Sequence, residues 1–317
     1  TDAAYNGRNP NDVALTNADD DNVNTIVVTT TADNADGDTA SLLALMQNRG
    51  ADGHVSLREA IIAANNTANG AGGADRIHFD VAGAGVHTIA VASVLPAITQ
   101  AVVIDATSEP DFAGTPMVEL DGSATTAANG LTITGGDSTV RGLIINRFDG
   151  AGVLLQVGGG NVIQGNWIGL AADGVIAAAN GSSGIVLDGS TNNLIGGTDP
   201  TARNVISGNV SAGIHVNTGS NSNTIEGNFI GTTATGDAAL GNAVGVTVNN
   251  ATLNAIRGNV VSGNAGIGVH LWQANNNVVA GNWIGLDASG TGPLGNTSSG
   301  VFVGSSSAVL GDFAYTP

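Results

Sequence analysis

The sequence predicts an all-β fold, a right-handed parallel β-helix with three short strands in each coil. The first observation behind this prediction is a short segment that returns six times along residues 161–312 at intervals of 23 to 32 residues. Five of the six copies begin with Asn, and one to three apolar residues follow. The second is that two more Asn positions recur within each interval, with short apolar segments between them. The third is the composition, with 48 Gly and only 3% aromatic residues, which is typical of a regular β-structure of small residues.

The repeated segments predict coils that stack on one another, because a unit of this length cannot bury its own apolar face. They begin at Asn161, Asn193, Asn223, Asn254, Asn277 and Ala308. The second series is Asn166, Asn204, Asn228, Asn259 and Asn282, and the third is Asn180, Asn209, Asn242, Asn264 and Asn296. We expect an Asn ladder at each of three corners, since Asn tolerates left-handed backbone and its amide can bond to the next coil. Parallel crossovers are almost always right-handed, which sets the predicted hand.

Charge and composition exclude several classes of function. The chain of 317 residues has a formal net charge of −18, with eight Arg and no Lys, so it repels phosphate backbones and nucleic acid is excluded as a partner. No apolar run is long enough for membrane insertion. There is no Cys, so disulfides are excluded. The sequence begins at Thr1 without a signal peptide, and we expect either a cytoplasmic protein or a mature or trimmed fragment of an exported one.

Three parts are predicted along the chain. Residues 1–24 are polar and resemble a linker, residues 25–96 form an N-terminal cap, and residues 97–317 form the β-helix. An acidic cluster of Asp33, Asp36 and Asp38 follows the first apolar run, and these residues are candidate calcium ligands. Their spacing differs from that of a regular calcium loop, so we favour a solvated turn. No other cofactor is expected.

A helix is predicted at residues 56–66. Ser56 and Glu59 have the spacing of a capping box, and Leu57, Ala60 and Ile61 fall on one helical face. A short amphipathic helix before a solenoid usually covers the open end of the core. We therefore expect this helix to cap the N-terminal end of the β-helix.

The sequence around this helix resembles a known family. Val55-Ser56-Leu57-Arg58-Glu59-Ala60-Ile61, with Ala74-Asp75-Arg76-Ile77 and Leu95-Pro96-Ala97-Ile98 after it, is similar to the CSLREA domain of bacterial secreted proteins. Val55 stands where that family usually has Cys, so a thiol role is absent. The resemblance implies an N-terminal domain before right-handed β-helix repeats and a secreted or cell-surface location in bacteria. It implies no particular reaction.

An aromatic column is predicted at one corner, formed by Trp167, Phe229 and Trp283 with Val205 and Val260 between them. Such a stripe is compatible with glycan binding. The aromatic residues occur only where a loop of 13 or 14 residues follows, however, so that the loop can fold over the ring. We therefore favour a small satellite core at this corner.

The catalytic candidates are Asp105, Asp121 and Arg141. The repeat alignment places Asp121 beside Arg141 and Asp105 beside Asp121, in one column that also contains a Glu226–Arg257 pair. Two carboxylates about 5 Å apart are the arrangement of a retaining glycosidase. Charge balancing by Arg141 is the simpler interpretation, and we favour it.

The candidate glycan-binding residues lie on a third face. His215 and His270 belong to one outward column, and Asp188, Asn217 and Trp272 belong to the column beside it. A Trp, two His, an Asp and an amide on one flat strand face can meet a sugar chain by stacking and hydrogen bonding. The alternative is a set of unrelated surface residues. His215 and His270 are two coils apart, too far to share one metal ion.

Together these features favour a structural or adhesive module of an exported bacterial cell-surface protein, with possible glycan binding through one β-helix face. The alternative is a polysaccharide-active enzyme, a lyase, hydrolase or epimerase, since β-helices commonly host such activities. The expected partners are an extracellular polysaccharide, or neighbouring subunits or domains at the C-terminal end, where residues 308–312 begin another coil.

Overall fold

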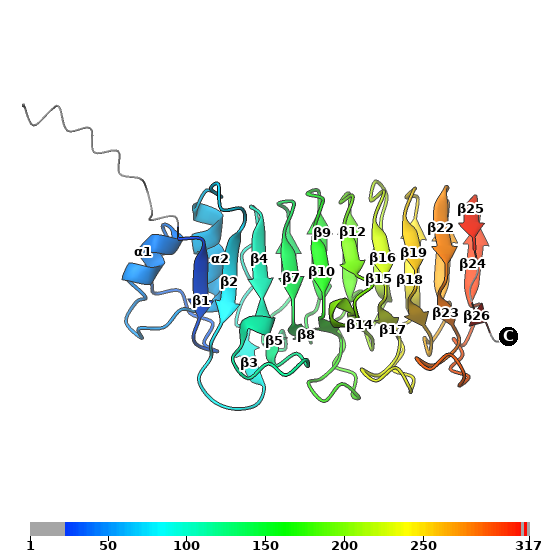
Figure 1. The fold of residues 1–317 in the computed structure, drawn as a ribbon, viewed down its shortest axis with the longest axis horizontal. Helices are drawn as coiled ribbons and strands as arrows, with labels where there is room; N and C mark the ends of the chain where they lie inside the picture. Colours follow the sequence, from blue (N-terminus) through cyan, green and yellow to red (C-terminus); the bar gives the residue numbers. More distant parts are fainter. Residues whose placement is uncertain (1–22, 312–313, 316–317) are drawn as a thin grey trace, which may run out of the picture.

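The computed structural model describes residues 23–311 and the backbone of residues 314 and 315. Three parallel sheets of ten, nine and seven strands run along a rod, one strand of each sheet to a coil in the regular part (Figure 1). The predicted fold, a right-handed parallel β-helix with three strands per coil, is confirmed. We name the sheets by their strand numbers.

The strands are short and follow one another from sheet to sheet. The ten-stranded sheet consists of β1 (Thr25–Val28), β2 (Asp75–Phe79), β4 (Val102–Asp105), β7 (Thr139–Arg141), β10 (Val162–Gln164), β13 (Leu194–Gly196), β16 (Thr224–Glu226), β19 (Ala255–Arg257), β22 (Asn277–Ala280) and β25 (Ala308–Leu310). The nine-stranded sheet consists of β3 (His87–Ala90), β5 (Val118–Asp121), β8 (Leu143–Asn146), β11 (Trp167–Ile168), β14 (Val205–Ile206), β17 (Phe229–Ile230), β20 (Val260–Val261), β23 (Trp283–Ile284) and β26 (Ala314–Tyr315). The seven-stranded sheet consists of β6 (Leu131–Ile133), β9 (Val153–Gln156), β12 (Ile185–Asp188), β15 (Ala212–Val216), β18 (Val244–Asn249), β21 (Val269–Trp272) and β24 (Val301–Gly304).

The core is a stack of inward side chains, one or two from each strand. In the ten-stranded sheet the fully buried residues Ile163, Ile195, Ile225, Ile256 and Val279 lie in register from coil to coil. Their neighbours along each strand point outward, as the two-residue period of a strand requires. The same apolar pattern therefore produces both the core and the exposed columns.

The three predicted Asn ladders are present at the corners, and all their Asn residues except the half-buried Asn296 are buried. At the corner before the nine-stranded sheet, the side-chain amide of Asn204 donates to the side-chain oxygen of Asn228 at 2.9 Å, and Asn228 donates to Asn259 at 3.0 Å. The other two series repeat this contact, for example from Asn193 to Asn223 at 2.7 Å and between later members of each series. Each ladder residue also satisfies backbone groups that the corner would otherwise bury without a partner.

We expected the ladder Asn residues to have left-handed backbone, and this expectation is wrong, because the left-handed residue is the one before each Asn at most corners. The positive φ angles belong to the preceding residue at most of these corners, for example Asn192 (φ 57°), Leu253 (φ 62°) and Gly227 (φ 71°). The ladder Asn itself must direct its amide inward along the rod, so the residue before it makes the turn. This explains why Gly precedes Asn so often at these corners.

The helix predicted at residues 56–66 is α2 (Leu57–Asn66), with the complete capping box of Ser56 and Glu59. A second helix, α1 (Leu42–Gln47), was not predicted, and short 3₁₀ turns η2 (Ala106–Ser108) and η3 (Pro200–Ala202) follow β4 and β13. Both α-helices lie at the N-terminal end of the stack, and their apolar faces join the continuous core (Figure 1). The ten-stranded sheet crosses the boundary drawn at residues 96 and 97 without a break, since β2 pairs with β4.

The Ser-Leu-Arg-Glu motif anchors two loops to α2. The Glu59 carboxylate, which is fully buried, accepts backbone N–H groups from Asp36, Gly37 and Ser56 at 2.7–2.9 Å. Arg58 forms an ion pair with Asp33 at 2.7 Å and donates to the Val94 carbonyl. Leu57 enters the core. The motif therefore fastens the loops around the helix start, which is a structural role.

The acidic cluster does not form a calcium site. Asp33 is paired with Arg58, Asp36 accepts from Asn34 and the Ala51 N–H, and Asp38 accepts from the N–H of residue 40. Among residues 23–311, no group of three or more His, Asp or Glu side chains is arranged to hold a metal ion. The three carboxylates diverge because each of them fastens a different part of the loop.

Two expectations lie wholly or mostly outside the described residues, namely the linker character of residues 1–24 and the contact of the C-terminal end with neighbouring subunits or domains. Of the C-terminal segment, the structure describes β25 and the pairing of β26 with β23. In the described part of the chain, no helix is long and apolar enough to cross a bilayer.

Candidate functional site: a groove along one corner of the β-helix

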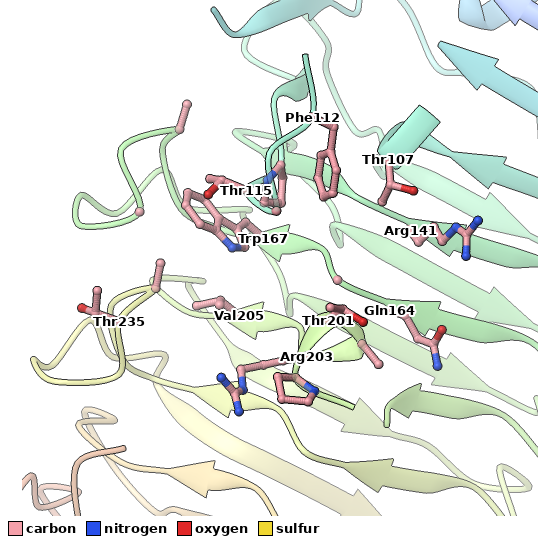
Figure 2. A pocket seen from close by; sticks show the side chains of 18 of the residues that line it. Thr107, Phe112, Thr115, Arg141, Gln164, Trp167, Thr201, Arg203, Val205 and Thr235 are labelled. Carbon is pink, nitrogen blue, oxygen red and sulfur yellow. The ribbon is translucent and has the colours of Figure 1, made fainter. Parts of the chain in front are cut away.

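A concave surface follows the corner between the ten-stranded and nine-stranded sheets. Two cavities of about 830 and 620 Å³ lie end to end there, and both are lined by Arg203, Ala234 and Thr235. We treat them as one groove. In Figure 2, Arg141 and Gln164 line it from the ten-stranded sheet, and Trp167 and Val205 line it from the nine-stranded sheet. Each of the two cavities has a volume within the range of ligand sites in proteins.

The loops that follow three strands of the nine-stranded sheet form the outer wall of the groove. Each loop places a Gly against an aromatic ring, Gly174 at Trp167, Gly236 at Phe229 and Gly290 at Trp283, and a Cβ there would come within about 3 Å of the ring. Each of these Gly residues also has a positive φ, between 71° and 75°. The close approach explains why these long loops repeat the same Gly position.

These long loops contact one another across an intervening coil. The N–H of Ala234 donates to the Gly174 carbonyl at 2.8 Å, and the N–H of Ala288 donates to the Gly236 carbonyl at 2.9 Å. The coils between them, with Val205 and Val260 in the aromatic column, have short loops. The wall of the groove therefore repeats every second coil.

The aromatic column has two different environments. Phe229 is only 7% exposed and packs with Leu170, Val205 and Val260 in a small apolar cluster, as the satellite-core interpretation expects. Trp283 is 36% exposed, and both it and the half-buried Trp167 line the groove. The satellite-core interpretation is therefore right for the centre of the column and incomplete for the two Trp residues.

Arg203 is the charged residue shared by the two parts of the groove. Its guanidinium lies 4.1 Å from the centroid of the Phe229 ring, and its Nε donates to the Gly227 carbonyl at 3.4 Å. Burial lowers the pKa of Arg203, although the group remains a cation at physiological pH. Among the described residues, no carboxylate lies within ion-pair distance of it. A polar ligand in the groove would meet this cation over an aromatic face.

The three catalytic candidates do not come together. Asp105 and Arg141 are in register on β4 and β7 and form an ion pair at 2.5 Å. Asp121 lies on β5 of the nine-stranded sheet, where it pairs with Arg147 at 3.1 Å. The predicted Asp121–Arg141 contact is therefore wrong, because Asp105 occupies the place in the column that was assigned to Asp121. The other predicted pair, Glu226 with Arg257, is confirmed at 3.1 Å.

The Asp105–Arg141 pair has the wrong protonation states for acid–base chemistry. Burial raises the pKa of Asp105, but hydrogen bonds from Arg141 and Thr107 and the Arg141 charge outweigh it, so the pKa lies below its usual value. The Asp105 hydrogen bond in turn raises the pKa of Arg141. Asp105 is thus an anion and Arg141 a cation at neutral pH. A general acid and a general base need pKa values near the working pH.

The candidate glycan-binding residues occupy the seven-stranded sheet in the predicted columns. His215 on β15, Thr247 on β18 and His270 on β21 are in register. Trp272, also on β21, is paired in register with Asn249 on β18. The Trp272 ring is 44% exposed, and the His270 ring lies 6.4 Å from it and 5.3 Å from Phe302. The result is an exposed aromatic patch at the C-terminal end of this sheet.

The remaining residues of that face are separate from the patch. His215 is half-buried and hydrogen-bonds with Asn249 at 3.1 Å, and burial together with the His270 charge lowers its pKa. Asp188 accepts a hydrogen bond from Gln156 at 3.3 Å, and Asn217 directly follows β15. These residues form a flat surface, in contrast to the concave groove.

One family model matches part of the chain. Residues 231–305 match the family model described as periplasmic copper-binding protein (NosD), which is less than half of the chain. No metal-holding group of His, Asp or Glu occurs in this segment of the structure. No curated protein matches the chain.

Several solved structures have a similar fold. The chain is 15% identical to the periplasmic alginate epimerase AlgG (TM-score 0.45), covering 76% of this chain and 60% of AlgG. It is 14% identical to full-length tailspike protein 2 of an Escherichia coli O157:H7 bacteriophage (TM-score 0.47; 92% of this chain, 35% of the tailspike) and to pectate lyase Pel9A (TM-score 0.38; 92% and 79%). The chain thus spans less than two thirds of the first two proteins. At these identities the likeness concerns the fold alone.

Proposed function

We propose that this chain is a polysaccharide-binding module of an exported protein, and that the groove between the ten-stranded and nine-stranded sheets is its binding site. The observation that carries the proposal is the line formed by Trp167, Arg203 and Trp283 along this groove. Aromatic rings stack on sugar rings, and Arg and amide groups such as Gln164 donate hydrogen bonds to their oxygens. An open groove along a rod also suits a long chain better than a small molecule.

The exported location is supported by two independent observations. The match to a family described as periplasmic covers residues 231–305, and the Ser-Leu-Arg-Glu motif resembles a domain of secreted proteins. The net charge of −18 also suits a protein that must stay soluble outside the cell. Attachment to a cell surface and adhesion belong to the same proposal.

The exposed aromatic patch of the seven-stranded sheet is the second candidate surface for the same function. Trp272 and Phe302 present rings to solvent, and the half-buried His270 contacts both rings. The face also includes Asp188, His215 and Asn217. The groove is favoured because it is concave and surrounds a ligand from two sides. A flat sheet face contacts a sugar chain from one side only.

Retention on a panel of immobilised polysaccharides tests the proposal. The parent chain is compared with the double variant Trp167→Ala/Trp283→Ala and with the matched variant Trp272→Ala. If the groove binds the polysaccharide, the double variant should lose retention and Trp272→Ala should be retained like the parent. The opposite pattern would assign the function to the seven-stranded sheet, and retention of all three or of none would contradict carbohydrate binding through either surface.

The same samples also test for catalysis. Release of reducing ends, or of unsaturated products that absorb in the ultraviolet, is measured for each polymer that the parent retains. We expect neither, because Asp105 and Arg141 are held as a fixed ion pair. Turnover that Asp105→Asn abolishes would establish the enzyme alternative.

A further inference from the structure

The groove has a period of two coils, and this period identifies a class of ligand. Its aromatic residues occupy every second strand of the nine-stranded sheet, Trp167 on β11, Phe229 on β17 and Trp283 on β23. The strands between them place Val205 and Val260 in the same column. Two strand spacings correspond to about 10 Å, so aromatic positions recur over about that distance along the groove.

The outer wall has the same period as the floor. Backbone hydrogen bonds join residue 234 to residue 174 and residue 288 to residue 236, each time across one coil with a short loop. A Gly at each long loop approaches the ring below it. Because floor and wall repeat together, the period belongs to the groove as a whole.

We infer that the groove binds a straight, β-1,4-linked chain of pyranose rings with one ring over each coil. This inference rests on the proposed function and adds the class of polysaccharide. In such a chain both bonds of each ring are equatorial, so the chain is a flat ribbon, and each ring advances it by nearly the strand spacing of about 4.8 Å. Successive rings are turned over, so the same face recurs at every second ring. Aromatic positions on alternate coils would therefore meet equivalent faces.

The aromatic position in the middle of the groove, Phe229, differs from the two at its ends, Trp167 and Trp283. At Phe229 the Arg203 guanidinium covers the ring at 4.1 Å, so this position presents hydrogen-bond donors to the groove. At Trp167 and Trp283 the indole rings themselves line the groove. A chain over this groove would stack at its ends and donate oxygens to Arg203 at its centre. The two indoles are four strand spacings apart, about 19 Å, which six sugar rings can span.

Two matched pairs of hexasaccharides test the inference by isothermal titration calorimetry. The neutral pair is cellohexaose, a flat β-1,4-linked ribbon, and laminarihexaose, which has the same glucose units with curved β-1,3 linkages. The acidic pair is hexamannuronate, which is flat, and hexaguluronate, whose α-1,4 linkages buckle the chain. In whichever pair binds, we expect the flat member to bind at least tenfold more tightly. Equal binding, or tighter binding of the bent member, would overturn the inference.

A variant that moves one aromatic position by a coil gives a second test. In Val260→Trp/Trp283→Val the indole lies on β20 instead of β23 and the total aromatic content is unchanged. We expect the affinity for the flat hexasaccharide to fall at least fivefold while Trp272→Ala leaves it unchanged, with the circular dichroism spectrum checking that each variant is folded. If the shifted variant is folded and binds the flat hexasaccharide as tightly as the parent, the two-coil spacing of the aromatic residues does not determine binding, and the inference is wrong.

The outcomes also separate this inference from the proposal on which it rests. Retention of a polysaccharide that is lost in Trp167→Ala/Trp283→Ala, without any preference for flat chains, would contradict only the ribbon. If neither pair of hexasaccharides binds, but a polysaccharide is retained by the parent and lost in Trp167→Ala/Trp283→Ala, again only the ribbon is contradicted. Absence of any retained polysaccharide would contradict both.

Discussion

Asn228 accepts hydrogen bonds from Asn204 and donates one to Asn259, so that a single buried side chain connects three successive coils. It also donates to the Ile195 carbonyl at 2.9 Å. A corner of the β-helix buries backbone groups that no strand partner reaches, and an Asn side chain can satisfy a donor and an acceptor at once. The ladder therefore holds the corner that borders the groove.

Asn228→Ala is expected to lower the free energy of unfolding by about 3 kcal/mol or more, because several buried partners lose their hydrogen bonds together. Chemical denaturation monitored by circular dichroism measures this change. Asn217→Ala is the matched control, since its half-buried side chain lies on the sheet face and outside the ladders. The control should change stability by less than about 0.5 kcal/mol. Equal effects in the two variants would show that the ladder does not stabilise the fold.

Asp75 occupies the first ladder column, three coils before Asn161. Its side chain is 2% exposed, one carboxylate oxygen has no hydrogen-bond partner, and burial raises its pKa to about 6. An unfolded Asp titrates near pH 4, so the folded state binds the proton more tightly. Stability should therefore fall as the pH rises from about 4 to 6, by at most about 3 kcal/mol, and stay at the lower value above that range.

Asp75→Asn should remove this pH dependence and raise the melting temperature at pH 7 by a few degrees, because an amide needs no proton to donate at this position. Melting temperatures between pH 4 and pH 8 provide the measurement. Asp80→Asn, at an exposed carboxylate nearby, should follow the parent curve. A parent curve that is flat between pH 4 and 6 would show that Asp75 is not a destabilising buried acid.

The Asp105–Arg141 pair has the opposite pH dependence. Although burial raises the pKa of Asp105, the hydrogen bonds and charge of its partners hold it below its usual value. The ion pair therefore stabilises the folded state above about pH 4, and this stabilisation is lost as the pH falls through the folded-state pKa of Asp105. Asp105→Asn should therefore cost about 1–2 kcal/mol at pH 7 and less at pH 3. Glu226→Gln, at a more exposed pair, is the control and should cost less than about 0.5 kcal/mol at either pH. A cost of Asp105→Asn that is the same at both pH values would show that the ion pair contributes nothing.

Glu59 fixes the N-terminal cap, because its buried carboxylate accepts three backbone N–H groups. Glu59→Ala leaves these donors without a partner and should lower the melting temperature by several degrees. Asp111→Ala, an exposed acidic residue, provides the control for the change of charge. A melting temperature of Glu59→Ala equal to that of the control would mean that the loop at residues 36 and 37 does not depend on this carboxylate.

The repeated Asn residues were sufficient to predict the β-helix, the three ladders and most of the exposed columns. The position of Asp121 could not be predicted from the repeat pattern. The segments Val102–Asp105 and Val118–Asp121 both have apolar residues at their first and third positions and both end in Asp. These shared positions do not tell the two segments apart, and only the pairing of β4 with β7 and of β5 with β8 separates them. Register outside the regular repeats depends on loop paths that the pattern does not contain.

The groove was missed for a related reason. The sequence shows the aromatic column and the long loops, and from these alone the loops were expected to bury the rings. Whether a loop covers a ring or stands beside it depends on contacts between loops two coils apart, such as residue 234 with residue 174. Trp283 remains 36% exposed, whereas Phe229 is covered by Arg203, which comes from the preceding coil. The repetition of Gly174, Gly236 and Gly290 is the sequence signal that marks the wall.

The most direct test is a crystal structure of this chain with the hexasaccharide that binds most tightly. We expect a sugar chain along the corner between the ten-stranded and nine-stranded sheets, with rings stacked on Trp167 and Trp283 and an oxygen hydrogen-bonded to Arg203. A sugar chain bound over Trp272 and Phe302 on the seven-stranded sheet, with the groove empty, would contradict it.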